Sequence, residues 1–295
     1  GVLSASEVAR LQEEVELLVQ HCPSDRGSSI DAAGNPILGY PSAYNFTDPQ
    51  TSDDPRTFTS QTRVLNRING MISFAPQAQI TAGHPSLLSI AESSYGKACV
   101  PFGDSYVLTL PKDGAGFSWH VDTGISEDNP YPFQRERGIN LGIYLDRSTE
   151  ENGCLHVVPG SHTAEVDLDR LIEEFGGGSR VPGAVAVPCE PGDVIVHARN
   201  VIHGSFENKS RMRRATYYLG YLPHEAVVTC KHDAQAIRRN QARIPLCVAA
   251  RTASGQHATE APFEYAPAEA GGLRDVLALG ERVLLDQRVT PLLGV

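Results

Sequence analysis

The chain has 295 residues, of which 41% are hydrophobic and 20% are charged. These values are typical of soluble globular proteins, and the length is sufficient for one large hydrophobic core. The formal net charge of −10 argues against a general nucleic-acid binder, which would present a basic face. There is no run of eighteen apolar residues, so we expect no membrane span. The first residues also lack the basic and apolar regions of a signal peptide.

The spacing of the cysteines indicates the redox state of the compartment in which the protein is expected. None of them forms a CxxC pair, and they stand at Cys22, Cys99, Cys154, Cys189, Cys230 and Cys247. This scatter favours buried thiols in a reducing compartment over a disulfide framework or a zinc knuckle. We therefore expect a cytoplasmic protein without nucleic-acid or membrane partners, and the sequence leaves its oligomeric state open.

The chain opens with a predicted helix followed by a long irregular stretch. Ser4 and Glu7 form an S-x-x-E capping box, and apolar residues recur after it at helical spacing. Residues 23–60 are rich in Pro, Gly, Ser, Asp and Asn, with four aromatic residues among them. Such a stretch is too long for a plain connector and is typical of a lid or a binding loop.

Short β-like runs then follow, separated by Gly and Pro. They cover residues 104–111, 116–122, 138–146, 153–161, 184–198 and 214–223. This pattern predicts an antiparallel sandwich or barrel. Helices are expected over 167–175, before a run of glycines, and over 273–285. We expect one β-rich domain over 1–295, with a core at about 100–222, an N-terminal helix and lid loop over 1–70, and a C-terminal helical extension over 224–295.

The stretch GFSWHVDTG, residues 116–124, places His120 and Asp122 two positions apart in an apolar, strand-like run. Side chains two apart on a strand point to the same face and are separated by roughly 6.5–7 Å. Both groups can therefore converge on one ion. Alone, however, such a pair is more often the solvated face of an edge strand.

A third candidate ligand strengthens the case for a metal. Residues 190–205 open with a Pro-Gly-Asp turn, continue as an apolar run and end near His203. Two histidines and one carboxylate, with the other positions open, form the facial arrangement of non-heme Fe(II) oxygenases. A structural zinc site would instead be closed by four ligands, usually including Cys. His197 lies six residues before His203 on the same predicted strand, about 20 Å away if extended, and is not expected to be a ligand.

Arg214 stands eleven residues after His203 and leads into another predicted strand. A guanidinium there is suited to binding a carboxylate through two hydrogen bonds. Taken alone, Arg214 would be assigned to a surface ion pair. Ser205, two residues after His203, can add a hydroxyl donor to the same carboxylate.

Together, the H-x-D pair, ENGCLHVVPGSH (151–162) and PGDVIVHARNVIHGSFENKSRMRR (191–214) resemble the phytanoyl-CoA dioxygenase family. Members are oxygenases that depend on Fe(II) and 2-oxoglutarate and fold as a double-stranded β-helix. The resemblance covers roughly residues 100–222, with weaker agreement over the N-terminal helix. It implies a β-rich fold with flanking helices around a jelly-roll, cupin-like core.

The resemblance also implies residue roles. His120, Asp122 and His203 would bind Fe(II), while Arg214 and Ser205 would hold the distal carboxylate of 2-oxoglutarate. The further positions implied to line the co-substrate are Tyr106 and Arg67. Gly142 departs from the family, whose members frequently have an aromatic residue there. Either the pocket is wider, or another ring fills it, with Trp119 and Tyr144 as candidates.

The implied reaction uses O₂ and 2-oxoglutarate to oxidise an unactivated C–H bond, and it releases succinate and CO₂. Because halogenating relatives lack the carboxylate that Asp122 supplies, hydroxylation is preferred over chlorination, while desaturation and ring formation stay open. Candidate substrate contacts lie in residues 31–62 and 123–138. No extended basic patch suggests a CoA pyrophosphate, so we expect a small metabolite, as in secondary metabolism.

Two alternatives stay open at this point. One is a cupin-like metal-dependent enzyme that does not use 2-oxoglutarate, which the position of Arg214 argues against. The other is a non-catalytic jelly-roll binding protein, which the three intact candidate ligands argue against.

Overall fold

The structure is a computed structural model that describes residues 1–25, 27–47, 64–111, 116–122, 138–163, 168–175, 181–229, 234–255, 257 and 259–265. The predicted helix over 273–285, most of the candidate substrate loop over 123–138 and residues 48–62 of the other candidate loop lie outside these ranges.

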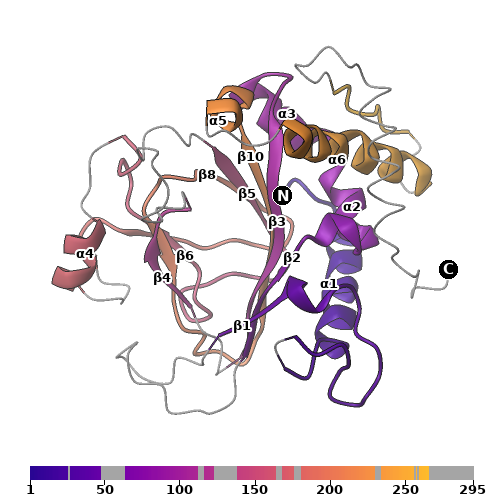
Figure 1. The fold of residues 1–295 in the computed structure, drawn as a ribbon. Helices are drawn as coiled ribbons and strands as arrows, with labels where there is room; N and C mark the ends of the chain where they lie inside the picture. Colours follow the sequence, from indigo (N-terminus) through magenta and orange to yellow (C-terminus); the bar gives the residue numbers. More distant parts are fainter. Residues whose placement is uncertain are drawn as a thin grey trace.

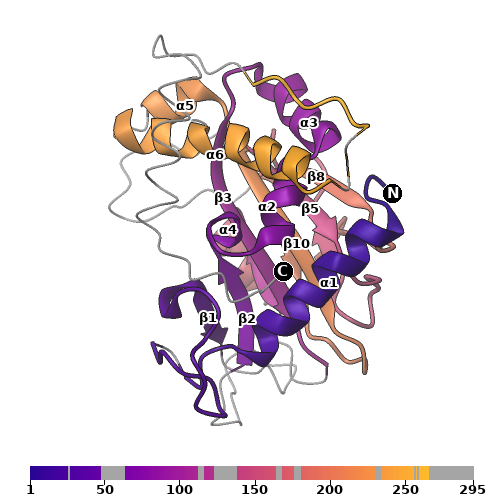
Figure 2. The ribbon, with the colours of Figure 1, turned by 90° about the vertical axis from the view of Figure 1, so that its right-hand side faces the viewer.

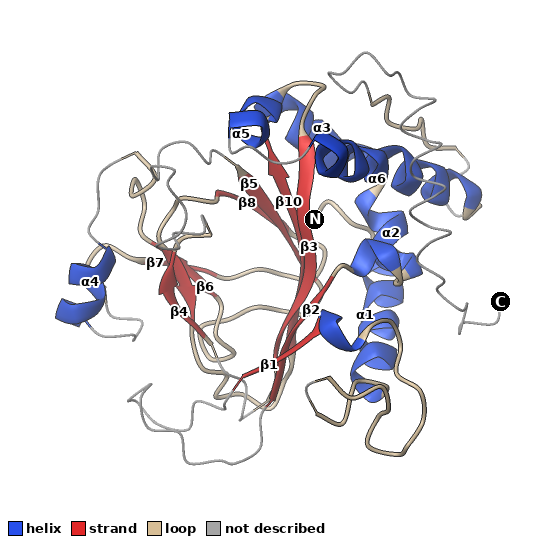
Figure 3. Cartoon of the chain, in the orientation of Figure 1, coloured by secondary structure: helices blue, strands red, loops and turns tan. Residues whose placement is uncertain are grey.

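Two antiparallel sheets face each other (Figures 1 and 3). The larger sheet has the order β1 (Tyr44–Thr47), β2 (Val64–Asn69), β3 (Val100–Thr109), β10 (Arg214–Leu222), β5 (Ile139–Tyr144) and β8 (Val194–Ala198). The smaller sheet has the order β4 (Phe117–His120), β9 (His203–Ser205), β6 (Leu155–Val157) and β7 (Val185–Val187). This arrangement confirms the predicted β-rich jelly roll.

Helices cover the outer face of the larger sheet, where Figure 2 shows α1, α2 and α6 in front of the strands. The helices are α1 (Ala5–Gln20), α2 (Pro76–Ala82), α3 (Pro85–Tyr95), α4 (Leu168–Phe175), α5 (His224–Thr229) and α6 (Ala234–Ala253), with short 3₁₀ turns at Pro41–Ala43 and Met71–Ser73. The capping box that predicted α1 is present, because Ser4 and Glu7 each accept a hydrogen bond from the other's main-chain N–H. Among the described helices, none is long and apolar enough to cross a membrane.

Strand alternation divides the larger sheet into two faces. Leu108 on β3, Tyr217 and Leu219 on β10, and Leu141 on β5 are buried in the core beneath the helices. Their neighbours along each strand face the smaller sheet. The space between the two sheets is therefore lined by every second residue of the central strands.

A buried carboxylate ties α1 to α2. Glu14 accepts hydrogen bonds from the main-chain N–H of Gln77 (2.6 Å) and Ala78 (3.0 Å) and from the hydroxyl of Tyr106 (2.8 Å). It caps α2, whose first residues have no capping side chain of their own. Burial raises the pKa of Glu14 from its ordinary 4.5 to about 7, although the hydrogen bonds lower it.

This carboxyl gives a pH-dependent stability. Because the pKa of Glu14 is higher in the folded state, its contribution is full below 4.5 and is lost as the pH rises through about 7. We expect the free energy of unfolding of the wild type to fall by up to about 3 kcal/mol across this window, relative to Glu14→Gln, whose amide does not titrate. Urea unfolding of both proteins at several pH values measures the difference. Parallel pH profiles would contradict the assignment.

Two features of the chain differ from expectation. Residues 184–198 are not one strand, because β7 and β8 belong to different sheets and a turn at Gly192 (φ 88°) separates them. Helices α2 and α3 were not predicted, although each begins with a proline, at Pro76 and Pro85, which is a favoured first helical residue.

Candidate metal and co-substrate site

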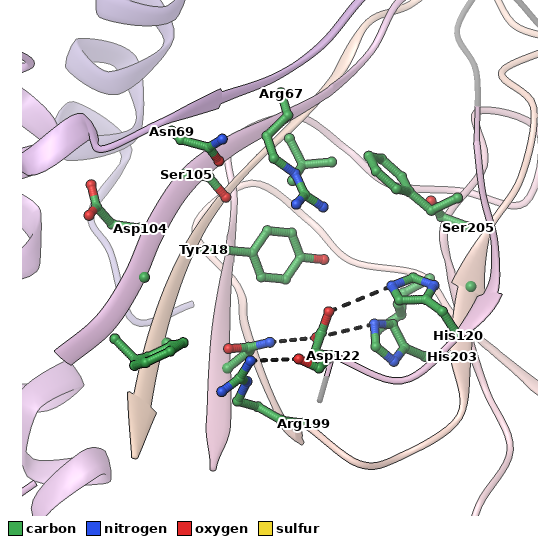
Figure 4. Close-up of a pocket in the computed structure, with 18 of the residues that line it drawn as sticks. Arg67, Asn69, Asp104, Ser105, His120, Asp122, Arg199, His203, Ser205 and Tyr218 are labelled. Atoms are coloured by element: carbon green, nitrogen blue, oxygen red, sulfur yellow. Dashed lines mark hydrogen bonds and ion pairs between the residues drawn. The ribbon is translucent and has the colours of Figure 1, made fainter. Parts of the chain in front are cut away.

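The three predicted ligands lie together between the sheets (Figure 4). Strands β4 and β9 pair antiparallel with His120 opposite His203, and Asp122 follows two residues after β4. Nε2 of His120 is 3.6 Å from Oδ1 of Asp122, and Nε2 of His203 is 3.4 Å from Oδ2. One ligand atom from each residue lies within 4.8 Å of the other two. This spacing fits a single metal ion.

Main-chain carbonyls fix how the two imidazoles are oriented. Nδ1 of His120 is 2.7 Å from the carbonyl oxygen of Ser118, and Nδ1 of His203 is 2.9 Å from that of Val201. Because a carbonyl only accepts, each Nδ1 carries the proton and each Nε2 presents its lone pair to the cavity. Metal-binding histidines are commonly oriented in this way.

The surroundings of His203 and Asp122 favour the protonation states that bind a metal. Burial, together with the neighbouring His120, lowers the pKa of His203 to about 3, although Asp122 raises it. Burial raises the pKa of Asp122, but the contacts with His120 and His203 outweigh it, so this pKa lies below its ordinary value. At neutral pH, therefore, His203 is neutral and Asp122 is ionised, as metal binding requires.

Asp122 is held by two residues that the sequence did not indicate. Nδ2 of Asn140 on β5 donates to its Oδ2 (2.6 Å), and the guanidinium of Arg199 donates to its main-chain oxygen. In return, the main-chain N–H of Asp122 donates to the carbonyl of Arg199 (2.8 Å). The carboxylate is thus oriented before any metal binds.

We expect Asn140→Ala to weaken Fe(II) binding about 10- to 100-fold, because loss of a residue that hydrogen-bonds a metal ligand typically lowers metal affinity by this factor. Anaerobic Fe(II) titration measures the change. Asn35→Ala, at an exposed asparagine that is not among the described residues lining the cavity, is the matched control. Equal affinities of all three proteins would show that Asn140 does not orient the ligand.

The metal cluster opens into a cavity of about 400 Å³ between the sheets, and three further predicted residues, Arg67, Ser205 and Arg214, line it. Arg214 is only 2% exposed. Its Nη2 donates to Oγ1 of Thr109 (2.8 Å), but its buried Nε has no partner among the residues that the structure places. A buried cation with an unmatched donor requires an anionic partner, so this end of the cavity fits a carboxylate.

Arg67 reaches the same cavity from β2 (Figure 4). Its guanidinium carbon lies 5.1 Å from the centre of the Phe117 ring, within the range of a cation–π contact. Its buried Nε also lacks a partner within the described part of the chain. Besides Arg214, Arg67 therefore offers a second cationic contact in the cavity.

Residues 1–216 match the family model described as phytanoyl-CoA dioxygenase (PhyH). The chain belongs to this family. A relative from Stutzerimonas stutzeri, named probable alpha-ketoglutarate-dependent hypophosphite dioxygenase, is 33% identical over 42% of this chain and 45% of its own length. The ectoine dioxygenase of Sphingopyxis alaskensis is 26% identical over 75% of this chain and 69% of its own length. The chain thus matches less than half the length of the first of these relatives.

Solved structures agree with the assignment to the phytanoyl-CoA dioxygenase family. AviO1 from Streptomyces viridochromogenes superimposes with a TM-score of 0.54 at 26% identity, covering 76% of this chain and 87% of that one. EctD from S. alaskensis, crystallised with bound Fe, superimposes with a TM-score of 0.52 at 25% identity, covering 76% of this chain and 70% of that one.

The family resemblance misplaced Tyr106. On β3, Ser105 and Val107 face the cavity, so alternation turns Tyr106 to the opposite face. Its hydroxyl donates to Glu14, and its ring lies 5.0 Å from that of Tyr217 in the core. The expectation that Tyr106 lines the co-substrate pocket is therefore wrong.

Tyr218 fills the space that Gly142 leaves open. The two residues are cross-strand partners, and a Cβ at Gly142 would lie 2.9 Å from the Tyr218 ring. The candidates Trp119 and Tyr144 were wrong: Trp119 packs against Phe206 beyond the cavity, and Tyr144 is fully buried. Tyr218 could have been found, because it stands four residues after Arg214 and so shares its face of the strand.

His197 lies much closer to the cluster than expected. Its ring centre is 4.7 Å from that of His203, because the chain turns between β8 and β9 instead of continuing as one strand. The predicted separation of about 20 Å is wrong. His197 is nevertheless outside the group of ligand atoms that converge, and it packs against His203 from β8.

Proposed function

We propose that this protein is a dioxygenase that depends on Fe(II) and 2-oxoglutarate and hydroxylates, or otherwise oxidises, a C–H bond of a small metabolite, releasing succinate and CO₂. The observation that carries the proposal is the shared cavity: a His–Asp–His cluster and the buried, unmatched guanidinium of Arg214 face the same space. The His–Asp–His cluster is suited to binding a metal ion, and the guanidinium of Arg214 is suited to binding a carboxylate.

His120, Asp122 and His203 would hold Fe(II), and two neutral imidazoles with one carboxylate leave positions open for other ligands. When bound, the metal supplies the oxidation chemistry with O₂ and 2-oxoglutarate. The protein contributes orientation: the main-chain acceptors of the imidazoles and the amide of Asn140 hold the ligand atoms before binding.

Arg214 would bind the distal carboxylate of 2-oxoglutarate through charge-assisted hydrogen bonds. Thr109 fixes one arm of its guanidinium, which leaves Nε free for the co-substrate. Ser205 would add a hydroxyl, and Arg67 a second cationic contact from β2. The buried setting strengthens each of these interactions because water does not compete with them.

Several features support a small-metabolite hydroxylase. Asp122 retains the carboxylate that halogenating relatives lack. Relatives named L-proline trans-4-hydroxylase and ectoine dioxygenase carry the names of small compounds. In a cupin-like enzyme that does not use 2-oxoglutarate, the buried guanidinium of Arg214 would lack an anionic partner. A non-catalytic binding protein would not need oriented metal ligands. A single domain over 1–295 and a cytoplasmic location stay predictions.

The test is succinate formation by the Fe(II)-loaded full chain in air, with 2-oxoglutarate and a panel of small metabolites. We expect succinate only when Fe(II), 2-oxoglutarate and O₂ are all present, with a higher rate for the metabolite that is oxidised. Iron binding without succinate formation under any condition would contradict the proposal.

A further inference from the structure

The cavity extends past the metal cluster to a second cationic end. Arg199 and Phe102 line this end, and Thr109 stands beside Arg214 at the other. Phe102 and Thr109 are seven residues apart on β3, or roughly 23 Å along an extended strand. We infer that Arg199 binds a carboxylate or phospho group of the substrate, on the side of the metal away from Arg214. The inference rests on the proposed function and names the class of substrate: small anionic metabolites.

Arg199 is held in place before any ligand arrives. Its Nη2 donates to the main-chain oxygen of Asp122, and its stem packs so closely on Gly138 that a Cβ there would lie 2.7 Å from Cδ of Arg199. The guanidinium carbon lies 5.1 Å from the centre of the Phe102 ring. A fixed guanidinium loses little entropy when it binds an oxyanion.

The same guanidinium has an unmet donor. Arg199 is 9% exposed, and its buried Nη1 has no hydrogen-bond partner among the residues that the structure describes. A buried donor without a partner is costly and is normally satisfied in a working protein. An oxyanion of a bound substrate would supply the missing acceptor.

Charge balance leads to the same conclusion. The described lining includes four arginines but only two aspartates. Asp104 is already matched by Arg243 (3.3 Å) and by the main-chain N–H of Ile72 (2.7 Å), and Asp122 belongs to the metal cluster. With Arg214 and Arg67 assigned to 2-oxoglutarate, Arg199 is left without a carboxylate in the described part of the cavity.

The position of Arg199 also limits the size of the substrate. Its guanidinium contacts the main chain of a metal ligand, so a bound oxyanion lies close to the metal. The cavity of about 400 Å³ must hold the co-substrate as well. The oxidised carbon should therefore lie within a few bonds of the anionic group.

The experiment uses the Fe(II)-loaded full chain, saturated with 2-oxoglutarate without oxygen, and follows the visible metal-to-ligand charge-transfer band as probes are added. The probes are matched pairs: propionate with propionamide, and methylphosphonate with its neutral dimethyl ester. We expect one of the anions to perturb the band saturably and its neutral counterpart to do so much more weakly. Which anion acts distinguishes a carboxylate from a phospho group.

We expect Arg199→Gln to raise the half-saturating concentration of the active anion about 10- to 100-fold, as for a lost hydrogen bond to a charged group. Arg147→Gln, at an exposed arginine paired with Glu190, should leave it unchanged. Arg199→Lys keeps the charge and should keep the preference for the anion over its neutral counterpart.

The outcomes separate the two proposals. Absence of the band in the wild type would reject the proposed function. If the band forms but the neutral probes act as strongly as the anions, the inference about Arg199 is wrong. A normal band in Arg199→Lys without preference for the anion would reject it equally, even if Arg199→Gln loses the band because Asp122 moves.

Discussion

His203→Ala should reduce succinate formation by about a thousandfold or more, because the metal contributes several kcal/mol and each 1.4 kcal/mol corresponds to a factor of ten. His203 is almost fully buried, and its Nε2 lies 3.4 Å from Asp122, so the variant removes one of the three ligand atoms that converge in the described part of the chain. Iron content after anaerobic loading should fall together with the rate.

Thermal melting of His203→Ala separates a lost ligand from a lost fold. We expect a cooperative transition like that of the wild type, since the residue lies at the cavity and outside the main core cluster. His21→Ala, at a partly exposed histidine that contacts Asp31, is the matched control and should keep full activity. Retained iron and activity in His203→Ala would show that this residue is not a ligand.

Arg214→Ala should weaken 2-oxoglutarate binding by about 30-fold to a few thousandfold, because removing one partner of a buried, hydrogen-bonded charge pair costs about 2–5 kcal/mol. The guanidinium is 2% exposed and already oriented by Thr109, so its loss leaves only Arg67 of the two proposed cationic contacts for the co-substrate carboxylate. The dissociation constant is measured by anaerobic titration of the Fe(II) protein with 2-oxoglutarate.

Iron binding should be almost unchanged in Arg214→Ala, which distinguishes a co-substrate contact from general damage to the site. Arg211→Ala, three residues earlier and exposed, is the control and should bind 2-oxoglutarate normally. If Arg214→Ala binds the co-substrate as tightly as the wild type, Arg214 is not its carboxylate contact, and unchanged turnover as well would favour the cupin-like alternative.

The cluster of His120, Asp122 and His203 could be predicted because its signal is local. Strand alternation predicts that His120 and Asp122 point the same way, although β4 ends at His120. His203 follows a recognisable Pro-Gly-Asp turn and apolar run. The first helix could be predicted for a similar reason, since the capping box of Ser4 and Glu7 lies within a single turn.

The residues that support the ligands could not be predicted, because their contacts join distant parts of the chain. Asn140 reaches Asp122 across 18 residues, and Arg199 reaches it across 77. No spacing rule in one sequence indicates such partners. They depend on how the sheets pack, which only the assembled fold determines.

The errors about Tyr106 and His197 have a common physical origin. A strand shifted by one residue turns each side chain to the opposite face, so a loose correspondence at β3 selected Tyr106 instead of its neighbours Ser105 and Val107. For His197, the predicted distance to His203 assumed one extended strand. The chain instead turns between β8 and β9, which brings the two imidazole rings into contact.

The central claim is that one ferrous ion, bound by His120, Asp122 and His203, shares a cavity with a co-substrate site at Arg214. Anaerobic titration of the Fe(II)-loaded protein with 2-oxoglutarate tests this most directly. The account predicts a visible charge-transfer band that saturates at one 2-oxoglutarate per bound iron. A folded protein that binds iron but develops no band at any 2-oxoglutarate concentration would contradict it.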